Sequence, residues 1–247
     1  MMQPRKIIMM KKLLWLWGAA SVAVLAWGTR LALFVAPTEA TMGNVQRIFY
    51  WHVPSAIMGL IFPYVNFIAA LVYLGVRRKS VTAADKADAF ALAAAEVTLV
   101  FVSIGLITGM LWGRASWGIW WTWDERLTTY LLLWLLYVSY MLVRRFSSTG
   151  QTHTLAAVIS VFAAIDVPVV YMSIRWWRTQ HPSPVFFGGK DSGIDPSMMP
   201  AFLWCLLGWA MWGVFILCLR YGLERRRQRI AYNTALRAVE AGLEGNA

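Results

Sequence analysis

The chain has 247 residues, of which 59% are hydrophobic and 14% charged, whereas a typical soluble domain has about 25% charged residues. This composition argues against a soluble fold. The 15% of aromatic residues argue against a disordered chain, and the presence of only two cysteines argues against a disulfide scaffold. An integral membrane protein remains, and it has two unusual features: fifteen tryptophans and a net charge of +11.

Six apolar stretches are long enough to span a membrane, which takes about 20 residues per helix. In chain order they cover residues 13–35, 55–76, 89–112, 127–143, 155–173 and 200–221. We expect an all-α polytopic membrane protein, with a six-helix domain over 1–223 and a basic tail over 224–247. The first stretch resembles a signal peptide, but its apolar run continues past Arg30 to Val35 without a clear cleavage site. An uncleaved helix is therefore favoured.

Lysines and arginines gather on one side of the six predicted spans. Sixteen of the 23 lie in the N-terminal segment, the second and fourth loops, and the tail: Arg5, Lys6, Lys11, Lys12, Arg77, Arg78, Lys79, Lys86, Arg144, Arg145, Arg220, Arg225, Arg226, Arg227, Arg229 and Arg237. The others are Arg30, Arg47, Arg114, Arg126, Arg175, Arg178 and Lys190. Cytoplasmic loops carry the cationic excess, so we expect cytoplasmic termini and three outward loops, at about 36–54, 113–126 and 174–199. This topology accounts for much of the +11 charge without a nucleic-acid partner.

The second outward loop is rich in tryptophan. The fragment WGRASWGIWWTWDER, residues 112–126, holds five of the fifteen tryptophans. Indole rings stack on planar aromatic ligands and exclude water, and Gly113 and Gly118 allow a close backbone approach. We interpret the fragment as a flat apolar platform for a planar ligand. Asp124 opens the next helix, where an acidic side chain suits the helix dipole, so a capping role is compatible with a role in ordering the ligand.

Two of the three histidines fall on the same side as this platform. His52 lies in the first outward loop, just before Pro54, and His181 lies in the third, whereas His153 falls on the cytoplasmic side. Taken singly, each histidine more often has a surface or capping role. Two histidines beside a planar aromatic trap favour axial ligation of a haem iron. Zinc would need a third protein ligand that these loops do not clearly offer.

Three separate segments resemble one known family. WGIWWTWD, residues 117–124, looks like the tryptophan-rich "WWD" signature of haem-handling membrane proteins in cytochrome c maturation. RIFYWHVPSA (47–56) and SIRWWRTQHP (173–182) resemble the blocks that carry the two histidines in the heme exporter protein C family. The resemblance covers nearly the whole chain. One departure is Arg175, which stands where the family has an acidic residue, so the electrostatics near His181 are expected to differ.

This resemblance implies a haem-binding site and its residues. Proteins similar to this one bind haem b at the outer membrane surface, with His52 and His181 carried over as the axial iron ligands. The carried-over haem-binding motif consists of Trp117, Gly118, Trp120, Trp121, Trp123 and Asp124. The two haem propionates call for arginine partners. Outward candidates are Arg47, Arg114, Arg126 and Arg178, and Arg126 ranks first because it closes the platform; ordinary interfacial snorkelling is the competing reading for each.

The resemblance also implies partners and a location. Haem would pass to a periplasmic haem chaperone from a site on the bacterial inner membrane. The chain would sit in an ABC-type complex with an ATPase, a second membrane subunit and a small single-helix protein. No GxxxxGK[ST] phosphate loop occurs in this sequence, so ATP hydrolysis is expected on a partner, and the chain itself is expected to transfer haem without being an enzyme.

Two other classes of function stay open on the residues alone. A membrane b-type redox cytochrome would hold its ligands within the membrane, yet no histidine falls inside a predicted span. A solute transporter would use intramembrane acids such as Glu96 and Asp166, for which packing is about as plausible. The tail either lies on the anionic inner leaflet or docks onto the ATPase, and it is expected to extend the last helix.

Overall fold

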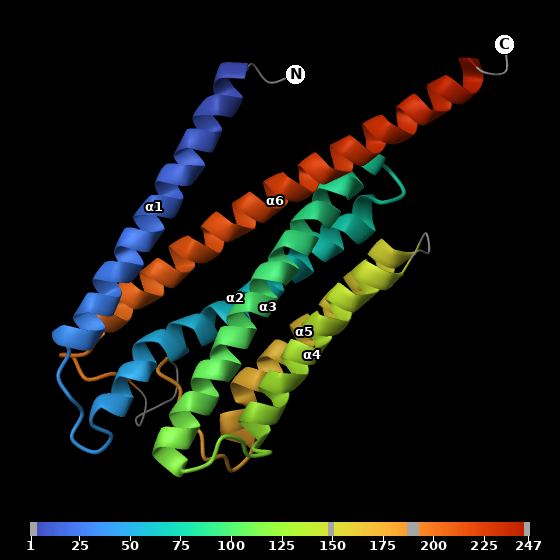
Figure 1. The fold of residues 1–247 in the computed structure, drawn as a ribbon. Coiled ribbons are helices and arrows are strands. Elements are labelled where there is room, and N and C mark those ends of the chain that lie inside the picture. Colours follow the sequence, from blue (N-terminus) through green and yellow to red (C-terminus); the bar gives the residue numbers. More distant parts are fainter. Residues whose placement is uncertain (1–3, 148–150, 187–192, 245–247) are drawn as a thin grey trace.

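The structure is a computed structural model that describes residues 4–147, 151–186 and 193–244, apart from the side chains of 4–7 and 242–244. Its elements are α1 (Pro4–Phe34), the short 3-10 helix η1 (Asn44–Ile48), α2 (Phe49–Val76), α3 (Val81–Trp117), α4 (Glu125–Phe146), α5 (Thr152–Trp176) and α6 (Met199–Glu244) (Figure 1). Each of the six α-helices contains a stretch long and apolar enough to cross a membrane. The predicted all-α polytopic fold is therefore confirmed.

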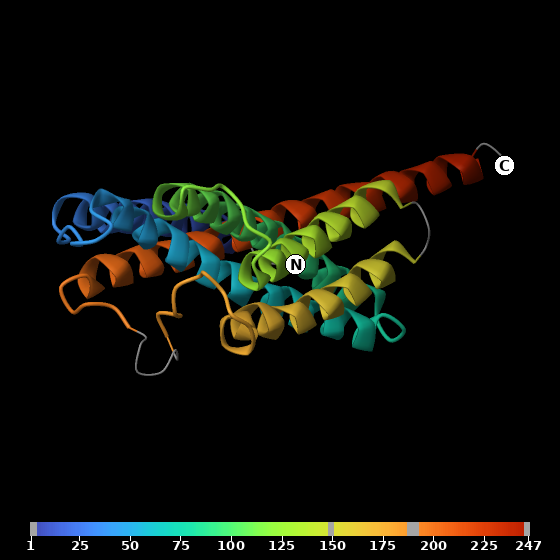
Figure 2. The same ribbon diagram turned by 90° about the horizontal axis from the view of Figure 1, so that it is seen from below.

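The helices pack side by side as three pairs, which Figures 1 and 2 show from two directions. α2 and α3 form the central pair, the α4–α5 pair lies against one side of it, and α6 lies against the other side with α1 packed chiefly on α6. Three apolar clusters fill the contacts between these pairs, around Tyr137, Phe101 and Phe202. Both termini lie at one end of the bundle, here named the tail end; the opposite end is named the site end.

Small residues bring α1 and α6 close together. A Cβ on Gly28 would lie 2.8 Å from the backbone nitrogen of Cys205, and one on Gly208 would lie 2.8 Å from the side chain of Leu25. Membrane helices associate through such close packing because lipid supplies no hydrophobic driving force between them. These two glycines therefore set the crossing of the first and last helices.

Several helices extend beyond the stretches expected from the sequence. α2 begins at Phe49 and has Pro54 inside it, so the expected loop 36–54 includes η1 and the start of α2. Tyr50, at this start, is fully buried in a cluster with Phe202 of α6. α3 likewise continues to Trp117, where Gly118, at φ 77°, ends it. Lys190 and the last three residues of the expected tail lie outside the described residues.

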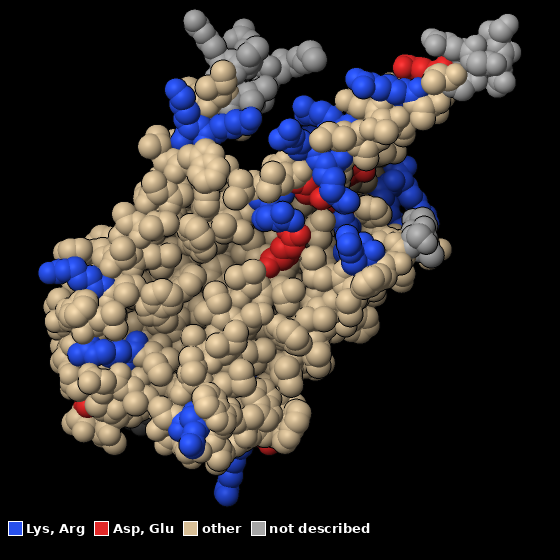
Figure 3. Space-filling model, viewed as in Figure 1, with Lys and Arg blue, Asp and Glu red and all other residues tan. Residues whose placement is uncertain are grey.

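Cationic side chains gather at the tail end, as Figure 3 shows. There, α6 continues to Glu244, which matches the expected extension of the last helix. Arg144 of α4 forms a buried ion pair with Asp88 of α3, and His153 of α5 binds the same carboxylate at 2.9 Å. One acid proposed for a solute path, Glu96, is ion-paired with Arg220 through two contacts of 2.6 Å. The other, Asp166, is 7% exposed on α5, and its Oδ2 has no hydrogen-bond partner among the described residues.

Candidate functional site

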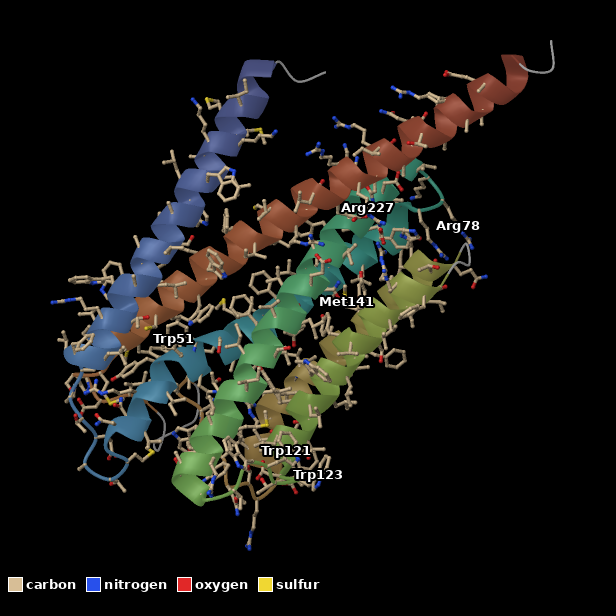
Figure 4. The ribbon with its side chains drawn as sticks, viewed as in Figure 1. Trp51, Arg78, Trp121, Trp123, Met141 and Arg227 are labelled. Atoms are coloured by element: carbon tan, nitrogen blue, oxygen red, sulfur yellow. The ribbon has the colours of Figure 1, made fainter. Side chains whose placement is uncertain are left out.

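The candidate site is a cavity at the site end, where the start of α2, the end of α3, the start of α4 and the segment after α5 meet. It measures about 60 Å³, less than the range of about 300–1,000 Å³ typical of small-molecule sites, so a larger ligand must also occupy the adjoining space. Figure 4 shows Trp121 and Trp123 at this end. The cavity is lined by His52, Ala56, Gly105, Leu106, Gly109, Met110, Trp112, Trp117, Trp121, Arg126, Leu127, Tyr130 and His181. It thus brings together both predicted iron ligands, two tryptophans of the predicted motif and the first-ranked arginine.

His52 projects from α2 with one ring nitrogen fixed by a hydrogen bond. Its Nδ1 lies 2.9 Å from the hydroxyl of Thr108, and that hydroxyl donates its own proton to the carbonyl of Ile104 at 2.6 Å. Thr108 must therefore accept from Nδ1–H, which leaves the lone pair on Nε2. Such a partner on the other ring nitrogen fixes the tautomer and orientation of a metal-binding histidine. The sequence had placed His52 in a loop, whereas in the structure it lies within the membrane-spanning helix α2.

His181 has the same tautomer for a similar reason. Its Nδ1 lies 2.9 Å from the carbonyl oxygen of Pro182, and a carbonyl can only accept, so Nδ1 carries the proton and Nε2 the lone pair. Desolvation, together with the positive charge of Arg126, lowers the pKa of His181 to about 4. The imidazole is therefore neutral at physiological pH, as a metal ligand must be.

The tryptophans differ from the expected flat platform. Trp112 and Trp117 meet edge to face at an interplanar angle of 85°, and Trp121 and Trp123 do so at 84°. Trp112, Trp117 and Trp121 line the cavity, while Trp120 is 56% and Trp123 76% exposed. Because edge-to-face contacts are a preferred geometry for aromatic pairs, the crowded indoles form walls of a cavity and an exposed rim.

Arg126 is the one predicted propionate partner that lines the cavity. Its guanidinium donates to the carbonyl of Val170, and among the described residues it forms no ion pair. Arg47 is instead bound to the carbonyl of Ala32 at 2.5 Å, and Arg114 to that of Gly118. Arg178 lines a separate surface depression. A partly buried, unpaired guanidinium calls for an anionic ligand.

Two further polar atoms in the cavity wall lack a protein partner. The indole N–H of Trp121 and the hydroxyl of Tyr130 are buried and make no hydrogen bond among the described residues. Such groups are costly unless a ligand or water satisfies them. Tyr130 lies where Gly59 and Gly105 leave room, since a Cβ on either glycine would come within 2.6 Å of the hydroxyl. The wall therefore offers donors to a ligand that carries acceptor oxygens.

Asp124 does not line the cavity, and its carboxylate is used within the protein. Oδ1 accepts from the backbone N–H of Arg126 at 2.9 Å, so the predicted capping of α4 is present. Desolvation would raise the pKa of Asp124, but hydrogen bonds from Thr179, Gln180 and Arg126 outweigh it and lower the pKa below its usual value. The side chain is therefore ionised at neutral pH.

A wider cavity of about 460 Å³ adjoins the first. The two share His52, Ala56, Trp112, Arg126 and His181, and the wider one continues along η1 and the segments 182–186 and 193–198. The two histidines thus stand at the junction of a narrow indole-lined space and a broader opening at the site end. Arg175, the departure from the family pattern, lies outside both and stacks over Tyr171 at 4.9 Å.

Sequence reasoning missed three residues of the site: Thr108, Gly109 and Tyr130. A weak signal existed for Tyr130 and Thr108, because residues four apart share one helix face. Tyr130 follows Arg126 by one turn, and Thr108 precedes Trp112 by one turn. What they contact depends on tertiary packing, which no spacing within one helix reveals.

These observations define a class: a polytopic helical membrane protein whose cavity, at one end of the bundle, presents two neutral imidazoles, three indoles and an unpaired arginine. Among the described residues, no cluster of three or more histidine, cysteine or acidic side chains could hold a metal ion by itself.

Comparison with known proteins agrees with this class. The family model of heme exporter protein C, CcmC, matches residues 1–235. The chain is 31% identical to heme exporter protein C of Escherichia coli (strain K12) over 219 residues, 86% of this chain and 85% of that one. It is 35% identical to heme exporter protein C of Bradyrhizobium diazoefficiens over 218 residues, 87% and 80% of the two chains. The chain is also 30% identical to a putative cytochrome c biosynthesis ccmC-like mitochondrial protein of Marchantia polymorpha over 188 residues, which is 76% of this chain and 77% of that one.

The chain belongs to the heme exporter protein C family. Membership implies a role in haem delivery for cytochrome c maturation and a transfer role rather than a catalytic one. The six apolar helices make it a multi-pass membrane protein.

Proposed function

We propose that the protein binds haem b across these two adjoining cavities and delivers it to a periplasmic haem chaperone. His52 and His181 are the axial iron ligands, Trp117 and Trp121 contact the macrocycle, and Arg126 binds a propionate. The observation that carries the proposal is that two histidines from distant parts of the chain line one cavity, each with Nδ1–H donated to a protein oxygen. Both Nε2 lone pairs are then free for iron.

The proposal also assigns the site a side of the membrane. Cationic side chains gather at the tail end (Figure 3), and cytoplasmic segments hold the lysine and arginine excess. The site end then faces the periplasm, and the wider cavity supplies an opening through which a soluble chaperone reaches the haem. ATP hydrolysis is assigned to a separate ATPase of an ABC-type complex, together with a second membrane subunit and a small single-helix subunit.

A b-type redox cytochrome is the second candidate, and the placement of His52 favours it. The sequence had argued against it because no histidine fell in a predicted span, yet His52 lies within the apolar helix 44–76. The two candidates differ in haem exchange: a redox cytochrome keeps its haem, whereas a delivery protein loses it to a chaperone.

The experiment is to co-express the protein with a periplasmic haem chaperone and stain the chaperone for covalent haem after denaturation. Delivery predicts labelled chaperone with wild type and with His153→Ala, and little with His52→Ala or His181→Ala. Equal labelling by all variants would contradict it.

Removing the charge of Arg126 is expected to weaken haem binding about 10-fold, because a charge-assisted hydrogen bond to a carboxylate contributes about 1.5–3 kcal/mol. Arg126→Gln keeps an uncharged, shorter hydrogen-bond donor, and haem dimethyl ester supplies a ligand without carboxylates. Wild type should prefer haem over its dimethyl ester in spectrophotometric titration, and Arg126→Gln should have lost most of that preference. Arg178→Gln, which lies outside the cavity, is the control that should retain it.

Filling the space beside His52 is expected to weaken haem binding about 10-fold, as other changes to groups that orient a metal ligand do. A Cβ on Gly109 would lie 3.1 Å from Cε1 of His52, so Gly109→Ala displaces the ring from Thr108. Gly75→Ala on α2 is the matched control, because no atom lies within 4 Å of its added Cβ. Haem affinity and spectrum report the result, and equal affinity in both variants would mean that the ring is not held as described.

A further inference from the structure

We infer that Asp124 is a positioning residue that holds the segment carrying His181 in place, rather than a group that contacts haem. The inference deepens the proposed function and rests on it for the role of His181 at iron. It concerns the aspartate of the tryptophan-rich motif, whose side chain is absent from the lining of both cavities.

The carboxylate of Asp124 joins two loops that are far apart in the sequence. Oδ1 accepts a hydrogen bond from the hydroxyl of Thr179 at 2.8 Å, and Oδ2 accepts one from the backbone N–H of Gln180 at 2.9 Å. The hydroxyl oxygen of Thr179 in turn accepts from the backbone N–H of His181 at 3.0 Å. A continuous chain of hydrogen bonds therefore connects Asp124 to the backbone of the second histidine.

Within the part of the chain that the structure describes, Asp124 is the residue of another element that holds this segment by hydrogen bonds. Among the described residues, every hydrogen bond that ties 178–182 to another element ends on Asp124; the bond from His181 Nδ1 to Pro182 is local. The nearest ties outside the segment are the backbone bond from Trp177 to Ser173 and the bond from Tyr171 to the carbonyl of Phe186. The position of His181 thus depends on one ionised side chain at the start of α4.

The two histidines are therefore held in different ways. His52 lies within a helix packed on α3, and its ring is bound by Thr108. His181 lies on an irregular segment that, among the described residues, is hydrogen-bonded to another element through the carboxylate of Asp124. Releasing that carboxylate frees His181 without unfolding a helix, so His181 is the ligand that can leave the iron when haem passes to another protein, while His52 stays.

The test uses the full-length protein in nanodiscs. It separates the hydrogen bonds from Asp124 to the segment of His181 from the capping of α4 by the same side chain. Asp124→Asn keeps one carbonyl oxygen, and asparagine caps helices as well as aspartate does, but its amide nitrogen cannot accept from Gln180. Thr179→Val removes the hydroxyl that joins Asp124 to His181. Glu125→Gln is the matched control, since it neutralises the adjacent acid, for which no hydrogen bond to the segment is present among the described residues.

Hydrogen–deuterium exchange without haem tests the fastening itself. Peptides covering 177–186 should exchange at least about 10-fold faster in Asp124→Asn and Thr179→Val than in wild type and Glu125→Gln. Peptides from the middle of α4 should be unchanged, which excludes general unfolding. Unchanged exchange at 177–186 in both variants would overturn the inference whatever the haem results are.

Haem spectra then test the consequence at iron. Asp124→Asn should resemble His181→Ala, with a larger high-spin, five-coordinate fraction, and added imidazole should restore the low-spin spectrum in both. A wild-type low-spin spectrum in Asp124→Asn would also overturn the inference. If exchange speeds up as expected but wild type itself binds no haem, the result supports the role of Asp124 in holding the segment of His181 and contradicts the proposed function.

Discussion

Replacing His52 by alanine is expected to weaken haem binding at least about 100-fold. Loss of groups that only orient a metal ligand costs about 10–100-fold, and His52 is assigned to the iron itself. Its ring is oriented by Thr108. Titration of haem into the purified apoprotein, followed by absorbance, measures the affinity.

His181→Ala is expected to have a smaller effect on affinity than His52→Ala, because the irregular segment lets water or another ligand reach the open iron position. His153→Ala is the control, since this third histidine binds Asp88 at the tail end. Wild-type affinity in both His52→Ala and His181→Ala would show that iron is bound elsewhere.

Breaking the buried ion pair at the tail end is expected to lower the free energy of unfolding by about 3–5 kcal/mol, because the remaining charge is left buried without its partner. The side chains of Arg144 and Asp88 are only 7% and 5% exposed. Asp88→Ala strands the guanidinium of Arg144 between α3, α4 and α5. Unfolding of the detergent-solubilised protein, followed by circular dichroism or by protection of Cys205 from labelling, measures the loss.

An exposed arginine at the same end serves as the control. Arg226 of α6 is exposed, so Arg226→Ala should cost less than about 1 kcal/mol. The double variant Asp88→Ala/Arg144→Ala should be less destabilised than the sum of its single variants, since it leaves no unpaired charge. Equal losses for Asp88→Ala and Arg226→Ala would contradict the assigned burial.

The sequence predicted the parts of this molecule that depend on local pattern. Apolar runs predicted six helices, and the capping of α4 by Asp124 was expected from its position before the fourth span. The placement of His52 and His181 on one side, and of His153 on the other, followed from counting spans. These features need only periodicity, length and charge.

Other features depend on contacts between distant segments, and the sequence could not reveal them. α2 starts at Phe49, where Tyr50 is buried in a cluster with Phe202 of α6. The five tryptophans divide between cavity wall and exposed rim because their rings meet edge to face. The partners of the two histidines, Thr108 and Pro182, include one residue that lies 56 positions away in the sequence.

The central claim is that His52 and His181 bind the same haem iron. Electron paramagnetic resonance of the purified ferric haem complex, with near-infrared magnetic circular dichroism, tests it directly because both signals depend on the axial ligands. We predict a low-spin spectrum typical of two imidazoles in wild type and in His153→Ala, converting to high-spin haem in His52→Ala and in His181→Ala. A low-spin bis-imidazole spectrum that persists in either cavity variant, or a wild-type spectrum without two nitrogen ligands, would contradict the claim.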